Sequence, residues 1–133
     1  MLIRVVAAAL YDAQGRVLIA ERPAGKHMAG RWEFPGGKIG VRESEREALD
    51  RELSEEIGVR VLAARPLMRL THDYRDRRVE LSLWIVERYS GEVGSLDGQR
   101  LRWVSPAALE AEDILEADRP FIEALQRLPP PPT

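Results

Sequence analysis

The chain has 133 residues and a formal net charge of −2, and 44% of its residues are hydrophobic while 32% are charged. This composition is typical of one folded domain and gives no general electrostatic attraction to nucleic acid or acidic lipid. The sequence has no cysteine, which excludes disulfides and fits a reducing compartment, and no stretch approaches the ~18 apolar residues of a membrane span. We expect a cytoplasmic protein, monomeric or homodimeric, without a stable nucleic-acid or membrane partner.

The first third of the chain predicts strands and a long loop. Residues 3–11 and 16–22 are rich in valine, isoleucine, leucine and alanine, and the intervening "DAQG" favours a turn, so together they predict a β-hairpin. Residues 23–37 are rich in glycine and proline and predict a loop, with a short strand at 32–34. Long ordered loops often carry function.

Residues 45–57 give the clearest helix signal in the sequence. Ser44 followed by Glu47 is a capping-box pattern, and Gly58 stands where the helix should end. On a helical wheel, one face is apolar and should meet the core; it holds Ala48, Leu49, Leu53 and Ile57.

The second half predicts three strands with helices between and after them. Strands are expected at 59–70 and 79–89, joined by the charged turn "THDYRDRR", and a further one at 101–104. Strands with interspersed helices indicate an α/β or α+β layered domain.

Two helix starts are predicted near the C-terminus. In "SPAAL", Ser105 has the character of an N-cap and is followed by proline, and Asp118 with Pro120 opens a last helix that runs to Leu128. We expect one domain over residues 1–128 and an extended, proline-rich tail over 129–133.

The helix at 45–57 carries an unusual acidic cluster. Glu52, Glu55 and Glu56 are spaced i, i+3, i+4 and encroach on the buried half of the wheel, and like charges at this spacing repel by a few tenths of a kcal/mol per pair. Arg51 can pair with Glu55 but does not satisfy three carboxylates, whereas Mg²⁺ takes carboxylate oxygens and keeps positions for water or phosphate. The preceding "FPGGK" lets backbone approach a metal or phosphate closely. Ordinary surface ion pairs and metal binding both stay open at this point.

The surrounding pattern favours metal binding. Gly37, Glu43, Arg51-Glu52-Leu53, Glu55-Glu56 and Gly58-Val59 fill every fixed position of G-x5-E-x7-R-E-U-x-E-E-x-G-U, where U is apolar. This resembles the Nudix box, and "KHMAGRWEFPGGKI", "DYRDRR" and "ADRPFIEAL" look like the MutT-type members of that family. The resemblance covers nearly the whole chain. It implies an α/β (α+β) fold, the Nudix-type α/β/α sandwich with a mixed β-sheet, a need for Mg²⁺ or Mn²⁺, and hydrolysis of a nucleoside diphosphate linked to another group.

The resemblance also implies roles for single residues. The implied metal ligands all offer oxygen atoms: the Gly36 carbonyl, Glu52, Glu55 and Glu56. Arg51 and Glu43 would orient the loop and the helix, and Glu52 is our first choice as general base. Asp97 stands where related proteins can have a glutamate, so its interpretation as a metal ligand or as a plain turn residue stays open.

Residues outside the helix are expected around the substrate: Arg22, His27, Lys38, Arg77 and Asp118. Arg22 and Lys38 would meet phosphates or sugar, or only solubilise the surface. Arg77 would approach the base together with Tyr74, or sit on a solvated turn. Asp118 corresponds to an asparagine that reads oxidised guanine in MutT, and it either reads the base or only caps the last helix.

The leading hypothesis is a MutT-like enzyme that hydrolyses an oxidised nucleoside triphosphate such as 8-oxo-dGTP to the monophosphate and pyrophosphate, which would cleanse the nucleotide pool. Alternatives are CTP or 5-methyl-dCTP, a dinucleoside polyphosphate, or ADP-ribose as substrate. A non-catalytic nucleotide sensor is a further alternative, although such modules are expected to lose a glutamate of the box and this chain keeps all of them.

Overall fold

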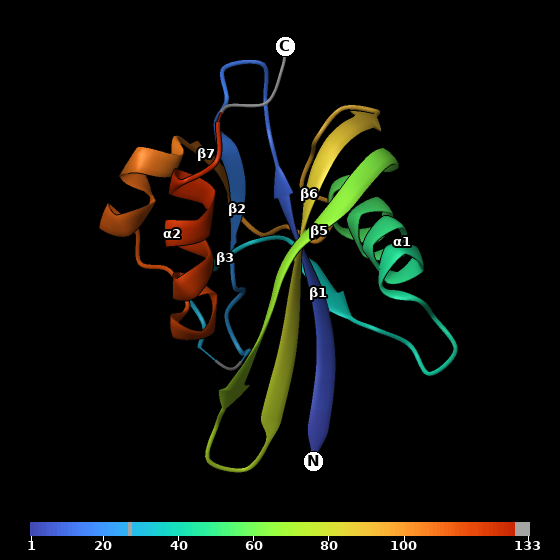
Figure 1. The fold of residues 1–133 in the computed structure, drawn as a ribbon, viewed down its shortest axis with the longest axis vertical. Helices are drawn as coiled ribbons and strands as arrows, with labels where there is room; N and C mark the ends of the chain where they lie inside the picture. The colour runs from blue at the N-terminus through green and yellow to red at the C-terminus, as the bar shows by residue number, and fades with distance from the viewer. Residues whose placement is uncertain (27, 130–133) are drawn as a thin grey trace.

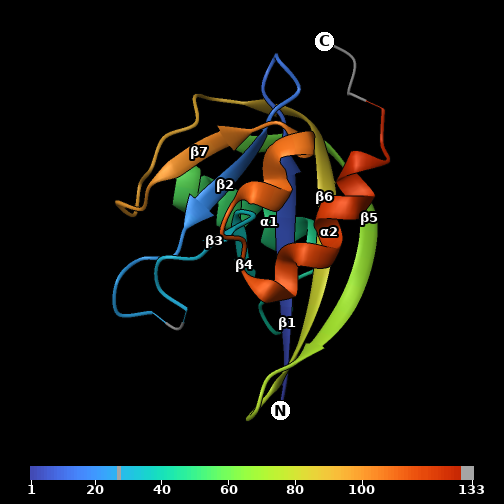
Figure 2. The same cartoon turned by 90° about the vertical axis from the view of Figure 1, so that its left-hand side faces the viewer.

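The computed structural model describes residues 1–26 and 28–129, in which two β-sheets lie between helices (Figure 1). The larger sheet has the order β4 (Gly36–Lys38), β1 (Leu2–Leu10), β6 (Arg78–Ser90), β5 (Arg60–Asp73). The smaller sheet has the order β3 (Trp32–Glu33), β2 (Val17–Glu21), β7 (Leu101–Val104). Helices α1 (Glu45–Ile57) and α2 (Arg119–Gln126) lie on opposite sides of the sheets, as the turned view also shows (Figure 2).

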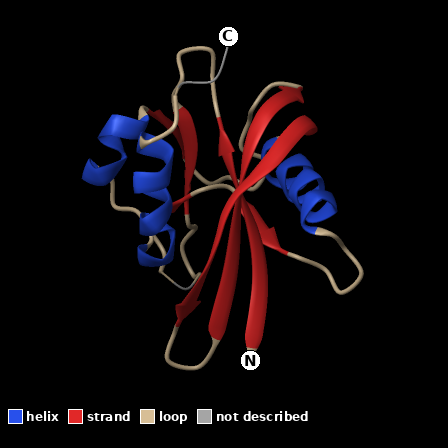
Figure 3. Ribbon diagram, in the orientation of Figure 1, coloured by secondary structure: helices blue, strands red, loops and turns tan. Residues whose placement is uncertain are grey.

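The larger sheet is mixed. Strand β1 runs parallel to β6, in register from Leu2 opposite Arg78 to Leu10 opposite Val86, whereas β4 and β5 are antiparallel to their neighbours. Helices outside and strands inside give the predicted sandwich (Figure 3). The predicted fold class, an α+β Nudix-type sandwich with a mixed sheet, is confirmed.

Strand β1 is the centre of the molecule because both of its faces are buried. Ala7 and Ala9 point into the core beneath α2, while Val6, Ala8 and Leu10 point into the core beneath α1. Successive side chains of a strand point to opposite faces, so a strand covered on both faces needs an uninterrupted apolar run. The segment "VVAAAL" supplies that run.

Helix α1 forms as predicted, with the expected ends. Ser44 accepts a hydrogen bond from the Glu47 amide, the Glu47 side chain accepts one from the Ser44 amide, and Gly58 closes the helix with φ of 74° in the left-handed region. The four apolar residues of the predicted face are fully buried: Ala48, Leu49, Leu53 and Ile57.

The predicted hairpin of residues 3–11 and 16–22 is wrong. The turn itself forms, because Asp12 Oδ1 accepts hydrogen bonds from the amides of Gln14 and Arg16, but only one bridge, between Tyr11 and Val17, joins the two arms. Strand β1 then enters the larger sheet and β2 the smaller one. Each arm instead pairs with two other strands: β1 with β4 and β6, and β2 with β3 and β7.

Other strand predictions hold with shifted ends. Strand β7 has the predicted bounds, and β3 forms within 32–34. Strand β5 continues to Asp73, so the charged turn shrinks to residues 74–77. Strand β4 was missed: its first two residues lie in the predicted loop, glycine is a poor strand former, and the strand forms through pairing with the distant β1.

The C-terminal helices differ from expectation at their starts. The "SPAAL" segment forms a 3₁₀ helix, η1 (Pro106–Ala111), without a side-chain cap from Ser105. A second 3₁₀ helix, η2 (Glu116–Asp118), leads into α2, whose side-chain cap by Asp118 is also absent. The capping interpretation of Asp118 is therefore wrong. Of the predicted tail, residues 130–133 lie outside the described residues.

No helix in the described residues has the length and apolarity that crossing a bilayer requires.

Candidate active site

A cavity of about 650 Å³ opens between the two sheets, beside α1 and the β5–β6 turn. Two groups of polar residues line it. The first surrounds the C-terminal half of α1 and comprises Gly36, Gly37, Lys38, Glu52, Glu56 and Asp97. The second comprises Arg22, Glu33, Tyr74, Arg77 and Asp118. The structure thus gathers residues that are up to 96 positions apart (22 to 118) around one space.

The glycine pair between β3 and α1 shapes the first group. The carboxylate of Glu52 lies against Gly37, where a Cβ would be 2.3 Å from Glu52 Oε2. Gly36 approaches β1 so closely that a Cβ would be 2.0 Å from the Val6 carbonyl oxygen, and its amide donates to Glu56 Oε2 at 3.2 Å. Only glycine leaves room for both approaches.

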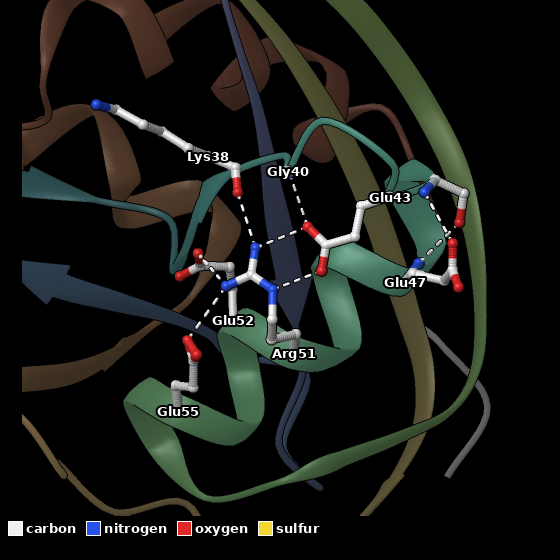
Figure 4. Close-up of polar contacts among 8 residues, drawn as sticks. Lys38, Gly40, Glu43, Glu47, Arg51, Glu52 and Glu55 are labelled. Atoms are coloured by element: carbon white, nitrogen blue, oxygen red, sulfur yellow. Dashed lines mark hydrogen bonds and ion pairs between the residues drawn. The ribbon is translucent and has the colours of Figure 1, made fainter.

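Arg51 connects the loop before α1 with the acidic cluster (Figure 4). Its Nη1 donates to Glu52 at 2.9 Å and to Glu55 at 3.2 Å, while its Nη2 donates to the Lys38 carbonyl at 3.0 Å and to Glu43 at 2.8 Å. Hydrogen bonds from Arg51 and then from the Gly40 amide lower the pKa of Glu43 to about 2. These contacts fit the orienting role that we expect for Arg51 and Glu43.

The three glutamates of the cluster differ in their surroundings. Burial, and then the charge of Glu52, raise the pKa of Glu56 to about 8, with smaller contributions from Glu33 and Asp97. Glu55 instead has a side chain that is 56% exposed and pairs with Arg51. Among the described residues, no three carboxylate or imidazole groups converge into a closed ligand set.

A hard divalent cation fits this donor set. The side chains of Glu52 and Glu56 place carboxylate oxygens against Gly37 and Gly36, and Mg²⁺ and Mn²⁺ prefer oxygen ligands. Burial, and then the neighbouring charge of Glu52, raise the pKa of Glu56, and a bound cation would oppose both effects. Glu52, Glu56 and the Gly36 carbonyl are the groups best placed to hold the ion, and Glu55 would join after leaving Arg51.

Asp97 reaches the same region from a different loop. Two main-chain hydrogen bonds hold this loop to the end of α1, from Gly94 to the Ile57 carbonyl at 3.1 Å and from Leu96 to the Glu56 carbonyl at 2.9 Å. The charge of Asp97 contributes to the raised pKa of Glu56. The loop therefore places this acid beside the cluster, as its predicted role as a metal ligand requires.

The second group contains a buried carboxyl that the sequence left ambiguous. Asp118 is only 3% exposed, and its Oδ2 accepts a hydrogen bond from the Phe34 amide at 3.0 Å. Burial, and then the charge of Glu33, raise the pKa of Asp118 to about 7. Asp118 faces the cavity with a polar group instead of capping α2.

Glu33 is a cavity residue that the sequence analysis missed. Arg22 Nη1 donates to its two oxygens at 3.0 and 3.2 Å, and burial raises the pKa of Glu33 although Arg22 opposes this. An acid between two aromatic residues in "WEF" was the available signal, because alternation in a strand turns it away from Trp32 and Phe34. Arg22 thus lies beside an acid of the second group and not beside the acids of α1.

The β5–β6 turn contributes Tyr74 and Arg77. The Arg77 guanidinium carbon lies 5.7 Å from the centre of the Tyr74 ring, and Arg77 Nε is buried without a hydrogen-bond partner among the described residues. A buried donor without a partner is costly, so this N–H is available to a ligand. Lys38 lines the cavity near α1. His27, also predicted to meet substrate, lies outside the described residues.

An α+β sandwich whose carboxylate-rich helix faces a pair of glycines is the arrangement of a Nudix hydrolase. The family model for the NUDIX domain matches residues 6–124. The chain therefore belongs to the Nudix family.

Three relatives show the similarity in detail. The chain is 35% identical over 126 residues to the 8-oxo-dGTP diphosphatase of Escherichia coli (strain K12), covering 95% of this chain and 98% of that protein. It is 36% identical over 123 residues to the CTP pyrophosphohydrolase of the same strain, covering 92% and 91%. A solved structure of MutT, from work on Aliivibrio salmonicida and Vibrio cholerae, matches with a TM-score of 0.83 at 30% identity over 96% of this chain and 100% of that chain. The protein is a MutT-like Nudix hydrolase.

Proposed function

We propose that the protein is a Mg²⁺-dependent nucleoside triphosphate pyrophosphohydrolase that releases a nucleoside monophosphate and pyrophosphate. The observation that carries the proposal is the position of Glu52 and Glu56 against Gly36 and Gly37, in a cavity that Asp118 also lines. The glutamates suit a metal and phosphates, and Asp118 suits a base.

The residues of α1 have distinct roles in this proposal. Mg²⁺ or Mn²⁺, when bound by these acids, neutralises phosphate charge and lowers the pKa of the attacking water. Arg51 holds Glu52 and the Lys38 carbonyl in register, since it donates to both. Glu52 accepts the proton of the attacking water as general base, with Asp97 as the second choice. Lys38, which lines the cavity, supplies positive charge to the phosphates.

In this proposal the carboxyl groups of Asp118 and Glu33 recognise the nucleobase. Asp118 and Glu33 present carboxyl oxygens, which as carboxylates only accept hydrogen bonds. A guanine edge offers two adjacent donors, the ring N1–H and the amino group, so ionised carboxylates favour guanine, and 8-oxo-dGTP is the preferred substrate in our proposal. Tyr74 and Arg77 would cover the base, with Arg77 Nε as a further donor.

CTP or 5-methyl-dCTP is the second candidate substrate. A protonated Asp118 can donate to the ring N3 of cytosine and accept from its amino group, and the pKa of about 7 allows both states near neutral pH. The 8-oxo-dGTP diphosphatase and the CTP pyrophosphohydrolase of Escherichia coli are about equally similar to this chain, at 35% and 36% identity, so their names favour neither substrate over the other.

A substrate panel tests the proposal. Hydrolysis with Mg²⁺ is measured on 8-oxo-dGTP, dGTP, CTP, 5-methyl-dCTP, UTP, ADP-ribose and a dinucleoside tetraphosphate. The nucleotide products are separated by chromatography for every substrate, because ADP-ribose and the tetraphosphate release no pyrophosphate, and pyrophosphate is measured for the triphosphates. We expect guanine or cytosine triphosphates to be cleaved best, and UTP poorly because its base edge presents one donor between two acceptors. A preference for ADP-ribose or the tetraphosphate would contradict the proposal, and binding of nucleotide without any hydrolysis would favour the sensor.

Several expectations from the sequence stay predictions. They are the cytoplasmic location, the single domain over residues 1–128, the monomeric or homodimeric state, and the lack of a nucleic-acid partner. Size-exclusion chromatography with light scattering measures the oligomeric state.

A further inference from the structure

The flank of α1 turned away from the cavity is fixed to the larger sheet by polar side chains. Strand β5 is an edge strand of that sheet, and Val61 lies at a bulge in its pairing with β6. The Val61 amide donates to Asp50 Oδ1 at 2.9 Å, and the Val61 carbonyl accepts from Arg46 Nη2 at 3.2 Å. Two side chains one helical turn apart thus supply the hydrogen bonds that another strand would give to this edge.

A second polar contact fixes the start of the helix. The Trp84 indole N–H donates to Glu45 Oε1 at 2.9 Å, and Arg69 donates to the other carboxylate oxygen of Glu45. Trp84 and Arg69 belong to β6 and β5. Helix α1 is therefore held at its first turn and again at Asp50, both times on the β5–β6 side.

The groups on the cavity side tolerate little rotation of the helix. On an ideal helix, Arg46 and Asp50 stand about 120° around the axis from Glu52 and Glu56. A side chain reaching about 6 Å from the axis moves by about 1 Å when the helix turns by 10°. Glu52 lies against the Gly37 α-carbon and Glu56 accepts from the Gly36 amide, and a displacement of about 1 Å is enough to spoil a catalytic arrangement.

We infer that Asp50 is a positioning residue for the metal-binding face of α1: its hydrogen bond to the Val61 amide sets the rotation of the helix and so places Glu52 and Glu56 against Gly36 and Gly37. Asp50 is not among the residues that line the cavity, and the described partners of its side chain are the Val61 amide and Arg60. The apolar face alone does not set this angle as tightly, because side-chain packing lets a helix roll slightly whereas a hydrogen bond is directional. This inference rests on the proposed metal role of Glu52 and Glu56.

The test measures Mn²⁺ binding to the metal-free protein without nucleotide, by the electron paramagnetic resonance signal of free Mn²⁺. Asp50→Ala removes the acceptor for Val61, whereas Asp50→Asn keeps an acceptor oxygen of the same size. Arg60→Ala is the matched control, since it removes only the exposed ion pair of Arg60 Nε with Asp50 Oδ1 at 3.5 Å. If Asp50→Ala does not fold, Asp50→Glu, which moves the acceptor by one methylene and so displaces the hydrogen bond to the Val61 amide, replaces it with the same expected loss.

We expect Asp50→Ala to bind Mn²⁺ about tenfold more weakly, as other changes behind metal ligands do, and to lower kcat without changing the nucleotide KM. Asp50→Asn and Arg60→Ala should stay within twofold of wild type. A core variant on the other side of the molecule, Ile122→Val, shows whether loss of stability alone weakens Mn²⁺ binding. Wild-type Mn²⁺ affinity in folded Asp50→Ala, or equal losses in Arg60→Ala or Ile122→Val, would overturn the inference. Failure of wild type itself to bind Mn²⁺ would instead overturn the proposed metal site.

Discussion

The carboxylate of Glu52 rests on the α-carbon of Gly37, in a space that a single Cβ would fill, 2.3 Å from Oε2. Helix α1 and strand β4 thus fit together because Gly37 has no side chain. The neighbouring Gly36 has a different contact, with the main chain of β1 at Val6. The two glycines should therefore fail in different ways when substituted.

Gly37→Ala should cost activity more than stability. The new methyl group displaces the flexible end of Glu52, so we expect kcat to fall about 100-fold while the melting temperature changes little. Gly36→Ala pushes a Cβ into the Val6 carbonyl oxygen, which cannot move without β1, and should destabilise the fold by about 3 kcal/mol or more. Calorimetry and initial rates on both variants check this, and an equally active Gly37→Ala would contradict the contact.

Arg51→Lys should lower activity about 10- to 100-fold, as loss of groups that orient metal ligands does. A lysine cannot bridge the Lys38 carbonyl, Glu43 and Glu52 at once, because it lacks the planar fork of arginine. Circular dichroism should show an unchanged fold. As a control, Arg127→Lys alters an exposed helical ion pair with Glu123 far from the cavity and should have wild-type rates.

The stability of the metal-free protein should fall as pH rises from about 4.5 to about 8. The pKa of Glu56 is raised from 4.5 to about 8 in the folded protein, so between these values the folded state holds a proton that the unfolded state has lost. The contribution is complete below the unfolded pKa and is lost as pH passes the folded pKa. Glu56→Gln should reduce the slope of melting temperature against pH, and Mg²⁺ should reduce it in wild type. An unchanged slope in Glu56→Gln would show that the pKa of Glu56 is ordinary.

Asp118→Asn should change which base is preferred. An amide oxygen can still accept from the Phe34 amide, but the amide group then offers the cavity a donor in place of an acceptor. We expect the ratio of kcat/KM for 8-oxo-dGTP to that for CTP to fall about tenfold, the scale of one misplaced hydrogen bond. Competition between the two substrates in one mixture measures this ratio directly, and a constant ratio would show that Asp118 does not read the base.

Local signals in the sequence were sufficient for α1. Its start, its end and its apolar face depend on residues within one segment of 15 positions, Ser44 to Gly58, and all agree with the structure. The acidic cluster could be recognised for the same reason. The predicted strands at 59–70, 79–89 and 101–104 also follow from residues close in sequence.

Long-range pairing explains what the sequence did not reveal. The turn at Asp12 has the expected hydrogen bonds, yet the partners of β1 and β2 are distant strands in two sheets. Asp118 has the local pattern of a helix cap, but its carboxylate instead accepts a hydrogen bond from the Phe34 amide, 84 positions away. The "WEF" pattern could indicate which way Glu33 points, but its position near Asp118 depends on packing between segments far apart in the sequence.

Mg²⁺ titration of product release is the measurement that tests the central claim most directly. Wild type, Glu56→Gln and a control with a changed exposed acid in η1, Glu110→Gln, are compared on 8-oxo-dGTP and CTP, with pyrophosphate and orthophosphate measured separately. We predict one pyrophosphate per monophosphate, an absolute need for Mg²⁺ or Mn²⁺, a loss of at least about 100-fold in Glu56→Gln, and no change in Glu110→Gln. Release of orthophosphate, or full activity of Glu56→Gln, would contradict the account.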